Sequence, residues 1–276
     1  MRSVQDKRIV ITGGSSGIGF ETARSLCARG GRVSLVVRSR ERGEAAAARI
    51  AAETGNPPEL LIADLSERKS IASAAEELLS RYPRIDVLIN NAGAYFDQRR
   101  EASDGLEMTF ALNHMSYFRL TTALLERIQA SAPARIINVS SAAHRRARLN
   151  FNDLQHSEQY RGFMVYSESK LANIYFTRAL ARRLEGSGVT VNALQSGFGS
   201  NNKGFSPGPF ILKLLASLIA VTPEKGAETS VYLAESPEVK GVSGAYFAGC
   251  RQVSPSPRAL DDEAAERLWR ISEELA

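Results

Sequence analysis

The segment from Arg8 to Gly19, RIVITGGSSGIG, decides the fold of this chain. It opens with a β-branched apolar run typical of a buried strand, and its glycines let the backbone turn tightly into a helix. At such a turn, free amides and the helix dipole can meet a pyrophosphate. The segment therefore predicts dinucleotide binding. The alternative is a glycine-rich turn that binds no ligand. A P-loop is excluded because no Gly-Lys-Ser/Thr follows. The expected contacts are Gly13, Ser15, Ser16, Gly17, Ile18 and Gly19.

Outward from this segment, strand-like and helix-like runs alternate along the chain. Strands rich in Val and Ile and separated by helices indicate a parallel sheet covered on both faces. We expect strands at 8–12, 33–37, 60–63, 87–89, 135–139, 190–194 and 244–247. We expect helices at 17–29, 40–53, from a Ser66 cap to 80, near 105–113, at 116–129 and through 166–170 to about Gly186. With no repeat or linker, residues 1–276 are expected to form one doubly wound, Rossmann-type α/β domain with a parallel seven-stranded sheet.

The composition is that of an ordinary globular protein, with 276 residues, 43% hydrophobic and 24% charged. The net charge of +5 is spread along the sequence, so we expect a small-molecule partner and no nucleic acid. A short basic cluster, His144 to Arg148, is expected to be a solvated loop.

The positions of the cysteines and histidines exclude further classes of protein. Cys27 and Cys250 form no Cys-x-x-Cys pattern and predict reduced thiols in a cytoplasmic protein. The three histidines have no metal-ligand spacing, so no metal is expected. We expect no signal peptide before the first strand, and the apolar run 210–221 is too short to span a bilayer.

Tyr166 and Lys170 are four residues apart and share one face of an expected helix. An ammonium at Lys170 favours the ionised form of a phenol whose usual pKa is about 10. The pair therefore predicts a tyrosine of lowered pKa that exchanges a proton near neutral pH. Two solvated side chains are the alternative, and the phosphate-binding turn argues against it.

The end of the second strand discriminates between cofactors. An NAD site would have an acidic residue there to bind the adenosine 2′-hydroxyl. This chain has Arg38, whose guanidinium could stack on adenine and bind a 2′-phosphate. The sequence thus favours NADP(H), against the alternative of a solvated arginine at the start of a helix.

Together with Asn90-Asn91-Ala92-Gly93, these features make the chain resemble the short-chain dehydrogenase/reductase family over nearly its whole length. The segments NVSSAAH (138–144), SKLAN (169–173) and SPSP (254–257) resemble its retinol-dehydrogenase-like members. The resemblance implies an oxidoreductase that moves a hydride between nicotinamide and a carbonyl or alcohol.

The resemblance also implies a catalytic tetrad. Tyr166 would be the general acid/base, and Lys170 would lower its pKa and hold the nicotinamide ribose. Ser141, rather than Ser140, would donate to the substrate oxygen. Asn113 would anchor a water that relays protons to Lys170. Alone, Ser141 could merely end a strand and Asn113 could cap a helix.

Further cofactor contacts follow from the same resemblance. Asp64 and Leu65 would contact adenine, although Asp64 could instead be a loop residue before a Ser66 cap. Asn91, Ala92 and Gly93 would line the cofactor with their backbone. Asn90 could instead brace the sheet.

One segment departs from the family pattern. After the sixth strand, Ser196-Gly197 stands where Pro-Gly is usual, and Asn201 stands where a Thr or Ser would bind the carboxamide. This departure motivates an alternative, a same-scaffold enzyme for cyclisation or dehydration with a structural or vestigial cofactor site. A cofactor-sensing scaffold without catalysis is a second alternative, which the retained tetrad disfavours.

The segment at about 198–222 has prolines and glycines followed by an apolar run, which suits a lid over a substrate pocket. An apolar lid indicates a lipophilic substrate or peripheral contact with a membrane surface. Packing on the core or on a partner subunit is the alternative. A homo-oligomer through the helices before the fifth and sixth strands would fit the family.

Overall fold

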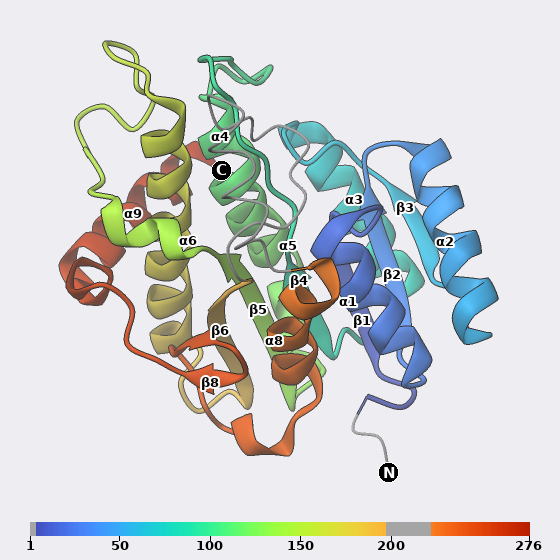
Figure 1. The fold of residues 1–276 in the computed structure, drawn as a ribbon. Coiled ribbons are helices and arrows are strands. Elements are labelled where there is room, and N and C mark those ends of the chain that lie inside the picture. Colours follow the sequence, from blue (N-terminus) through green and yellow to red (C-terminus); the bar gives the residue numbers. More distant parts are fainter. Residues whose placement is uncertain (1–3, 197–221) are drawn as a thin grey trace.

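One eight-stranded sheet runs through the described part of the chain, residues 4–196 and 222–276 of a computed structural model (Figure 1). Its strand order is β3-β2-β1-β4-β5-β6-β7-β8, and the first seven strands run parallel. The order reverses direction between β1 and β4, so the carboxyl ends of these strands flank the crevice where doubly wound sheets bind ligands. The predicted α/β architecture is confirmed, and an antiparallel edge strand, β8, is added to the seven expected.

The strands lie close to their predicted positions. They are β1 Arg8–Thr12, β2 Arg32–Val37, β3 Glu59–Ile62, β4 Val87–Asn90, β5 Ala134–Ser140, β6 Val189–Gln195, β7 Tyr246–Ala248 and β8 Arg251–Gln252. The helices are α1 Gly17–Ala28, α2 Arg40–Thr54, α3 Arg68–Arg81, α4 Met108–Phe110, α5 Ser116–Ala130, α6 Gly162–Arg183, α8 Pro223–Glu235 and α9 Asp262–Leu275. Short helical turns are η1 Ala111–Met115, η2 Ala142–Arg146, η3 Pro237–Val239 and η4 Pro257–Leu260.

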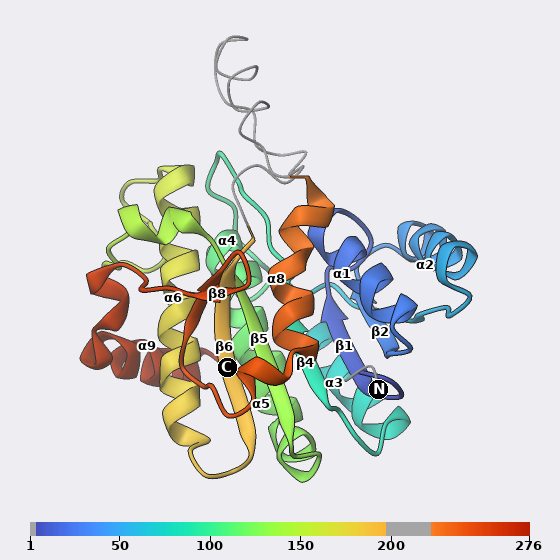
Figure 2. The same ribbon diagram turned by 60° about the horizontal axis from the view of Figure 1, so that its bottom comes forward.

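Helices cover both faces of the sheet because successive strand residues point to opposite sides. In β1, Ile9 and Ile11 pack with the layer of α1, α2 and α8, whereas Val10 packs with the layer of α3, α5, α6 and α9. The two layers are visible on either side of the strands (Figures 1 and 2). Both faces are apolar, which explains the continuous Val/Ile runs in the sequence.

The start of α3 differs from the expectation. Ser66 does not cap this helix; its hydroxyl and backbone N–H both donate to the Asp64 carboxylate, at 2.6 and 2.9 Å. The turn that they form ends before Glu67, which is the residue preceding the helix. The Ser66 hydroxyl thus bonds the neighbouring Asp64 and does not cap the helix.

Helix α9 packs against α6 (Figure 1) and also contacts α5. Its Trp269 ring stacks on Phe176 of α6, with ring centres 5.9 Å apart, and contacts Phe118 of α5 edge-on. The Arg183 guanidinium lies 4.0 Å above the same ring. Because α6 has the sheet on one side and α9 on the other, most of its residues are buried.

Candidate active site

The phosphate-binding turn is locked to the end of β4 by hydrogen bonds. The Thr12 hydroxyl accepts from the backbone N–H groups of Asn91 and Ala92, at 2.9 and 3.0 Å. The Asn91 side-chain amide donates back to the Thr12 carbonyl at 2.8 Å. The two predicted cofactor-binding segments, the turn at Gly13 and residues 91–93, therefore lie side by side.

Glycines are required in this turn by close contacts. Gly13 has a φ of +73°, and a Cβ there would lie 2.9 Å from the Ala92 Cα. A Cβ on Gly19 would lie 2.4 Å from the Gly13 carbonyl oxygen. Side chains are thus excluded where a bound group approaches the backbone.

The first turn of α1 has the features of an anion site. The helix begins after Ser16, whose side chain makes no capping bond to it in the part of the chain described. The amides that open α1 need a partner, and the phosphates of a dinucleotide would fit them. Ser15, Ser16 and Gly17 line this turn, whereas the Ile18 side chain faces α8, where a Cβ on Gly226 would lie 2.9 Å from it.

Arginines gather at the far end of the same turn. Arg38 is exposed directly after β2. Arg42, from the first turn of α2, donates to the Ser16 hydroxyl at 3.4 Å. Arg42 was not among the residues expected from the sequence; its position three residues after Ser39, which accepts from the Arg42 N–H, was the available signal.

Asp64 and Leu65 follow β3 at the edge of this region. The Asp64 carboxylate accepts hydrogen bonds from Ser66, and the Leu65 side chain is buried in the core. Asn90 braces the sheet, donating to Thr121 at 2.9 Å and to Asn138 at 2.8 Å. Adenine contacts by Asp64 and Leu65 stay a prediction.

Lys170, Asn113 and Gly93 meet behind the end of β4. A Cβ on Gly93 would lie 3.2 Å from the Lys170 Nζ and 3.1 Å from the Asn113 Oδ1. The Lys170 ammonium is buried and donates to the Val139 carbonyl at 3.3 Å. Burial lowers the pKa of Lys170 to about 8.

Asn113 lies in η1, a locally widened turn between α4 and α5. Its Oδ1 accepts from the Ala94 N–H at 2.8 Å, and its Nδ2 donates to the Ala94 carbonyl at 2.9 Å and to Ser169 at 3.0 Å. The side chain therefore ties the loop after β4 to α6. Widened turns of this kind often occur at functional sites.

Tyr166 lies one helical turn before Lys170 on α6. Burial raises the pKa of Tyr166, and a hydrogen bond with Ser141 opposes that rise. The expected net lowering of this pKa by Lys170 is wrong for the chain as described. Desolvation of the phenolate is the largest cause of the raised pKa, and the Lys170 Nζ lies 5.6 Å from the ring centre.

The two serines at the end of β5 have different surroundings. The Ser140 hydroxyl is buried and donates to the Lys170 carbonyl at 2.7 Å, which fixes β5 to α6. The Ser141 hydroxyl accepts from the Ala143 N–H at 3.2 Å and contacts Tyr166. The structure thus brings Ser141, and not Ser140, to the tyrosine.

The cluster from His144 to Arg148 is solvated only in part. Its three arginines are exposed, as expected, but the His144 side chain has no exposed surface. Two of its hydrogen-bond partners lie in β7 and in the tail before η4, far along the chain. The solvated-loop expectation is wrong for this residue.

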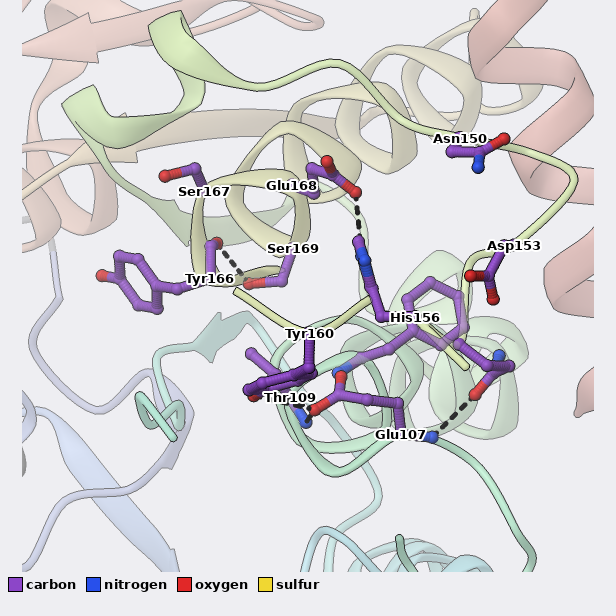
Figure 3. Close-up of polar contacts among 12 residues, drawn as sticks. Glu107, Thr109, Asn150, Asp153, His156, Tyr160, Tyr166, Ser167, Glu168 and Ser169 are labelled. Atoms are coloured by element: carbon purple, nitrogen blue, oxygen red, sulfur yellow. Dashed lines mark hydrogen bonds and ion pairs between the residues drawn. The ribbon is translucent and has the colours of Figure 1, made fainter. Parts of the chain in front are cut away.

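A polar network missed by the sequence analysis holds the loop 147–161 beside α6 (Figure 3). His156 lies 3.1 Å from the Glu168 carboxylate of α6. Tyr160 donates to the Phe96 carbonyl at 3.1 Å and lies 3.3 Å from buried Glu107. Tyr166 and Glu168 point to opposite sides of α6, because two residues turn a helix by about 200°. The network therefore anchors the loop without entering the tyrosine's side of the helix.

Two predictions from the sequence concern the segment after β6, most of which lies outside the described residues. They are the family departure at Ser196-Gly197 and Asn201, apart from Ser196 itself, and nearly all of the lid at 198–222. Within residues 4–196 and 222–276, no group of three or more His, Cys, Asp or Glu side chains could hold a metal. In the same ranges, no helix has the length and apolarity needed to cross a membrane.

The arrangement combines a turn suited to an anion, the paired hydroxyls of Tyr166 and Ser141, and the buried Lys170 ammonium. A tyrosine and a serine side by side can share one oxygen of a bound molecule, one by proton transfer and one by hydrogen bonding. This is chemistry for a carbonyl or alcohol oxygen.

Comparisons with known proteins agree with this chemistry. A family model described as short chain dehydrogenase matches residues 7–202. Retinol dehydrogenase 14 from Homo sapiens is 44% identical over 286 residues, covering 97% of this chain and 85% of that protein. A crystal structure of an uncharacterised Mycobacterium paratuberculosis protein has a TM-score of 0.82 at 32% identity, covering 100% of this chain and 95% of its own.

A Pseudomonas aeruginosa RhlG/NADP active-site complex has a TM-score of 0.73 at 28% identity, covering 89% of this chain and 95% of its own. Match length, identity and fold all lead to one conclusion. The chain belongs to the short-chain dehydrogenase/reductase family, among its retinol-dehydrogenase-like members, which are oxidoreductases that transfer a hydride between a nicotinamide cofactor and an alcohol or carbonyl.

Proposed function

We propose that this chain is an NADP(H)-dependent oxidoreductase that interconverts a carbonyl and an alcohol on a lipophilic small molecule. The observation that carries the proposal is the hydrogen bond between Tyr166 and Ser141, with the Lys170 ammonium one turn further along α6. Residues 1–276 then act as one domain, with the segment at about 198–222 as its lid.

The proposal gives each side chain of the tetrad a defined role. Tyr166 gives its proton to the nascent alkoxide, or takes one from the alcohol. Ser141 donates a hydrogen bond to the same oxygen. Lys170 binds the ribose hydroxyls and supplies positive charge beside the phenolate. Asn113 anchors a water that relays protons to Lys170. The cofactor, when bound, supplies or accepts the hydride.

The cofactor preference is proposed from charge. Arg38 and Arg42 flank the Ser16 end of the phosphate-binding turn, and guanidinium groups pair with phosphate in bidentate fashion. A structural relative, RhlG, is described in complex with NADP. Asp64, Leu65 and the backbone of Asn91, Ala92 and Gly93 complete the proposed cofactor site.

The substrate class is proposed from two features. The relative at 44% identity is named a retinol dehydrogenase, and retinol is a lipophilic alcohol. The apolar lid sequence agrees with such a substrate. A cytoplasmic location stays a prediction resting on the free thiols Cys27 and Cys250.

The proposal is tested with Tyr166→Phe. Loss of the proton donor should lower turnover of a carbonyl panel by at least about 100-fold, while NADPH affinity, measured by fluorescence titration, stays at the wild-type value. Tyr232→Phe, at a tyrosine on α8 that is distant in sequence from the tetrad and bonded to Glu238, is the matched control and should be unaffected. Unchanged turnover by Tyr166→Phe contradicts the assignment.

The same panel addresses the alternative reaction class. Cyclisation or dehydration, motivated by Ser196 in place of proline, would consume substrate without oxidising NADPH.

The cofactor preference is tested separately. Arg42→Ala should lower the preference for NADPH over NADH, measured as the ratio of kcat/KM values, and leave the NADH value unchanged. An unaltered ratio in the Arg38→Ala/Arg42→Ala double variant contradicts the NADP(H) assignment.

A further inference from the structure

His144 is enclosed by three segments that are distant in sequence. It lies in η2, three residues after Ser141, and none of its surface is exposed. The Tyr246 hydroxyl of β7 lies 3.3 Å from its Nδ1, and the Ser256 backbone of the tail contacts its Nε2. The imidazole thus connects the end of β5, β7 and the tail 254–257.

The tautomer of His144 follows from its partners. The Ser256 N–H can only donate, and it lies 3.0 Å from Nε2, so Nε2 carries no proton. The proton is therefore on Nδ1, which donates to the Ser141 carbonyl at 2.7 Å. Burial lowers the pKa of His144, which keeps the ring neutral. Tyr246 can direct its own proton to the Gln195 amide oxygen, at 3.1 Å.

The Ser141 carbonyl thereby has two donors from one residue. The His144 backbone N–H lies 3.1 Å from it and the Nδ1–H 2.7 Å. These bonds fix the peptide that follows Ser141, and with it the direction in which the Ser141 side chain leaves the backbone. Without the imidazole donor, the serine at the strand end could turn away from Tyr166.

We propose that His144 is a positioning residue, which holds the Ser141 hydroxyl at Tyr166 through its Nδ1–H and ties that serine to the tail through Nε2. The inference rests on the proposed function, because it gives Ser141 a part in the reaction. It adds that the serine is oriented by a histidine that never exchanges a proton itself.

Two substitutions separate the two contacts of His144. In His144→Asn, the side-chain amide nitrogen falls near the position of Nδ1, so the donor to Ser141 is kept and the acceptor for Ser256 is lost. In His144→Gln, the terminal amide falls near Nε2, so the acceptor is kept and the donor is lost. Ser256→Pro removes the tail N–H directly, at a φ of −66° that proline adopts.

The experiment measures kcat, KM and NADPH affinity for each variant with the carbonyl substrate found in the panel. We expect His144→Gln to lower kcat about tenfold, equivalent to the loss of one hydrogen bond of about 1.4 kcal/mol in the transition state. KM and NADPH affinity should stay near wild type. His144→Asn and Ser256→Pro should keep kcat within about threefold, since each retains the donor to Ser141.

A double-mutant cycle separates positioning from general destabilisation. In a Ser141→Ala background, His144→Gln should cause no further loss of kcat, because there is no hydroxyl left to position. A loss that persists there, or equal losses in the Asn and Gln variants, overturns the inference. Should His144→Gln not fold, nitrogen chemical shifts of the wild-type imidazole decide: protonated Nε2 overturns the inference and protonated Nδ1 supports it.

Failure of the proposed function is distinguishable in the same series. If Ser141→Ala alone keeps wild-type turnover, the serine has no part in the reaction, and both the assignment and the inference are overturned. If Ser141→Ala loses turnover and His144→Gln does not, only the inference is overturned.

Discussion

Replacing Glu168 by Gln should make the stability of this protein less dependent on pH. The Glu168 carboxylate of α6 lies 3.1 Å from the His156 imidazole of the loop 147–161 (Figure 3), and the two side chains are only 13% and 14% exposed. The hydrogen bond between Glu168 and His156 is the main cause that raises the pKa of His156 above 6.5. The negative charges of Glu107 and Asp153 raise the same pKa to a smaller extent.

The magnitude follows from the kind of hydrogen bond that is lost. A bond between charged groups contributes about 1.5–3 kcal/mol, and the neutral bond that Gln could still form contributes about 0.5–1.5 kcal/mol. The pair is well shielded from solvent, so screening reduces the difference little. We expect Glu168→Gln to cost about 1–1.5 kcal/mol, or about 2–6 °C in Tm for a domain of this size.

The sign of the pH dependence is set by the raised pKa of His156. Below the unfolded value of 6.5, the imidazole is protonated in both states and the pair stabilises the fold fully. As the pH rises through the higher folded value, the proton leaves and this stabilisation is lost. The Tm difference between wild type and variant should therefore be largest near pH 6 and nearly absent near pH 9.

Thermal unfolding followed by circular dichroism at these two pH values tests the reasoning. Glu158→Gln is the matched control, because it removes the same charge from an exposed position of the same loop and should leave Tm unchanged. A difference of equal size at both pH values, or one that grows toward high pH, would refute the charge-assisted pair.

Two further variants test the dinucleotide turn and the packing of α9. Gly19→Ala should weaken NADPH binding at least tenfold, on the order of 1.4 kcal/mol, because its Cβ would lie 2.4 Å from the Gly13 carbonyl oxygen; wild-type affinity in a fluorescence titration would contradict this. Trp269→Ala should cost about 3–5 kcal/mol, since the buried ring packs on Phe118 and Phe176; a urea midpoint near that of wild type would show that α9 adds little to stability.

The core of the fold was predictable because its strands are apolar on both faces. The run Arg8–Thr12 was located to the residue, and the remaining parallel strands lie close to their predictions. The edge strand β8 was missed because Arg251 and Gln252 are exposed and carry no apolar pattern. At Ser66, the sequence could not show whether its hydroxyl would cap a helix or bind Asp64, since both are local and similar in free energy.

The site was predictable where a local motif fixes the geometry and not where distant segments meet. Tyr166 and Lys170 share a helix face by spacing alone. His144 bonds Ser256, which is 112 residues away in sequence, and no local pattern indicates that contact. The pKa of Tyr166 was predicted with the wrong direction because desolvation depends on the tertiary packing around the ring.

Helix α9 has a consequence for assembly. It lies over α6 and contacts α5, the helices before the sixth and fifth strands, through which we expected two copies to associate. Its Asp262 and Glu266 already pair with Arg178, Arg182 and Arg183 of α6. A second subunit that approaches from this side would meet α9 before it reached α6 or α5.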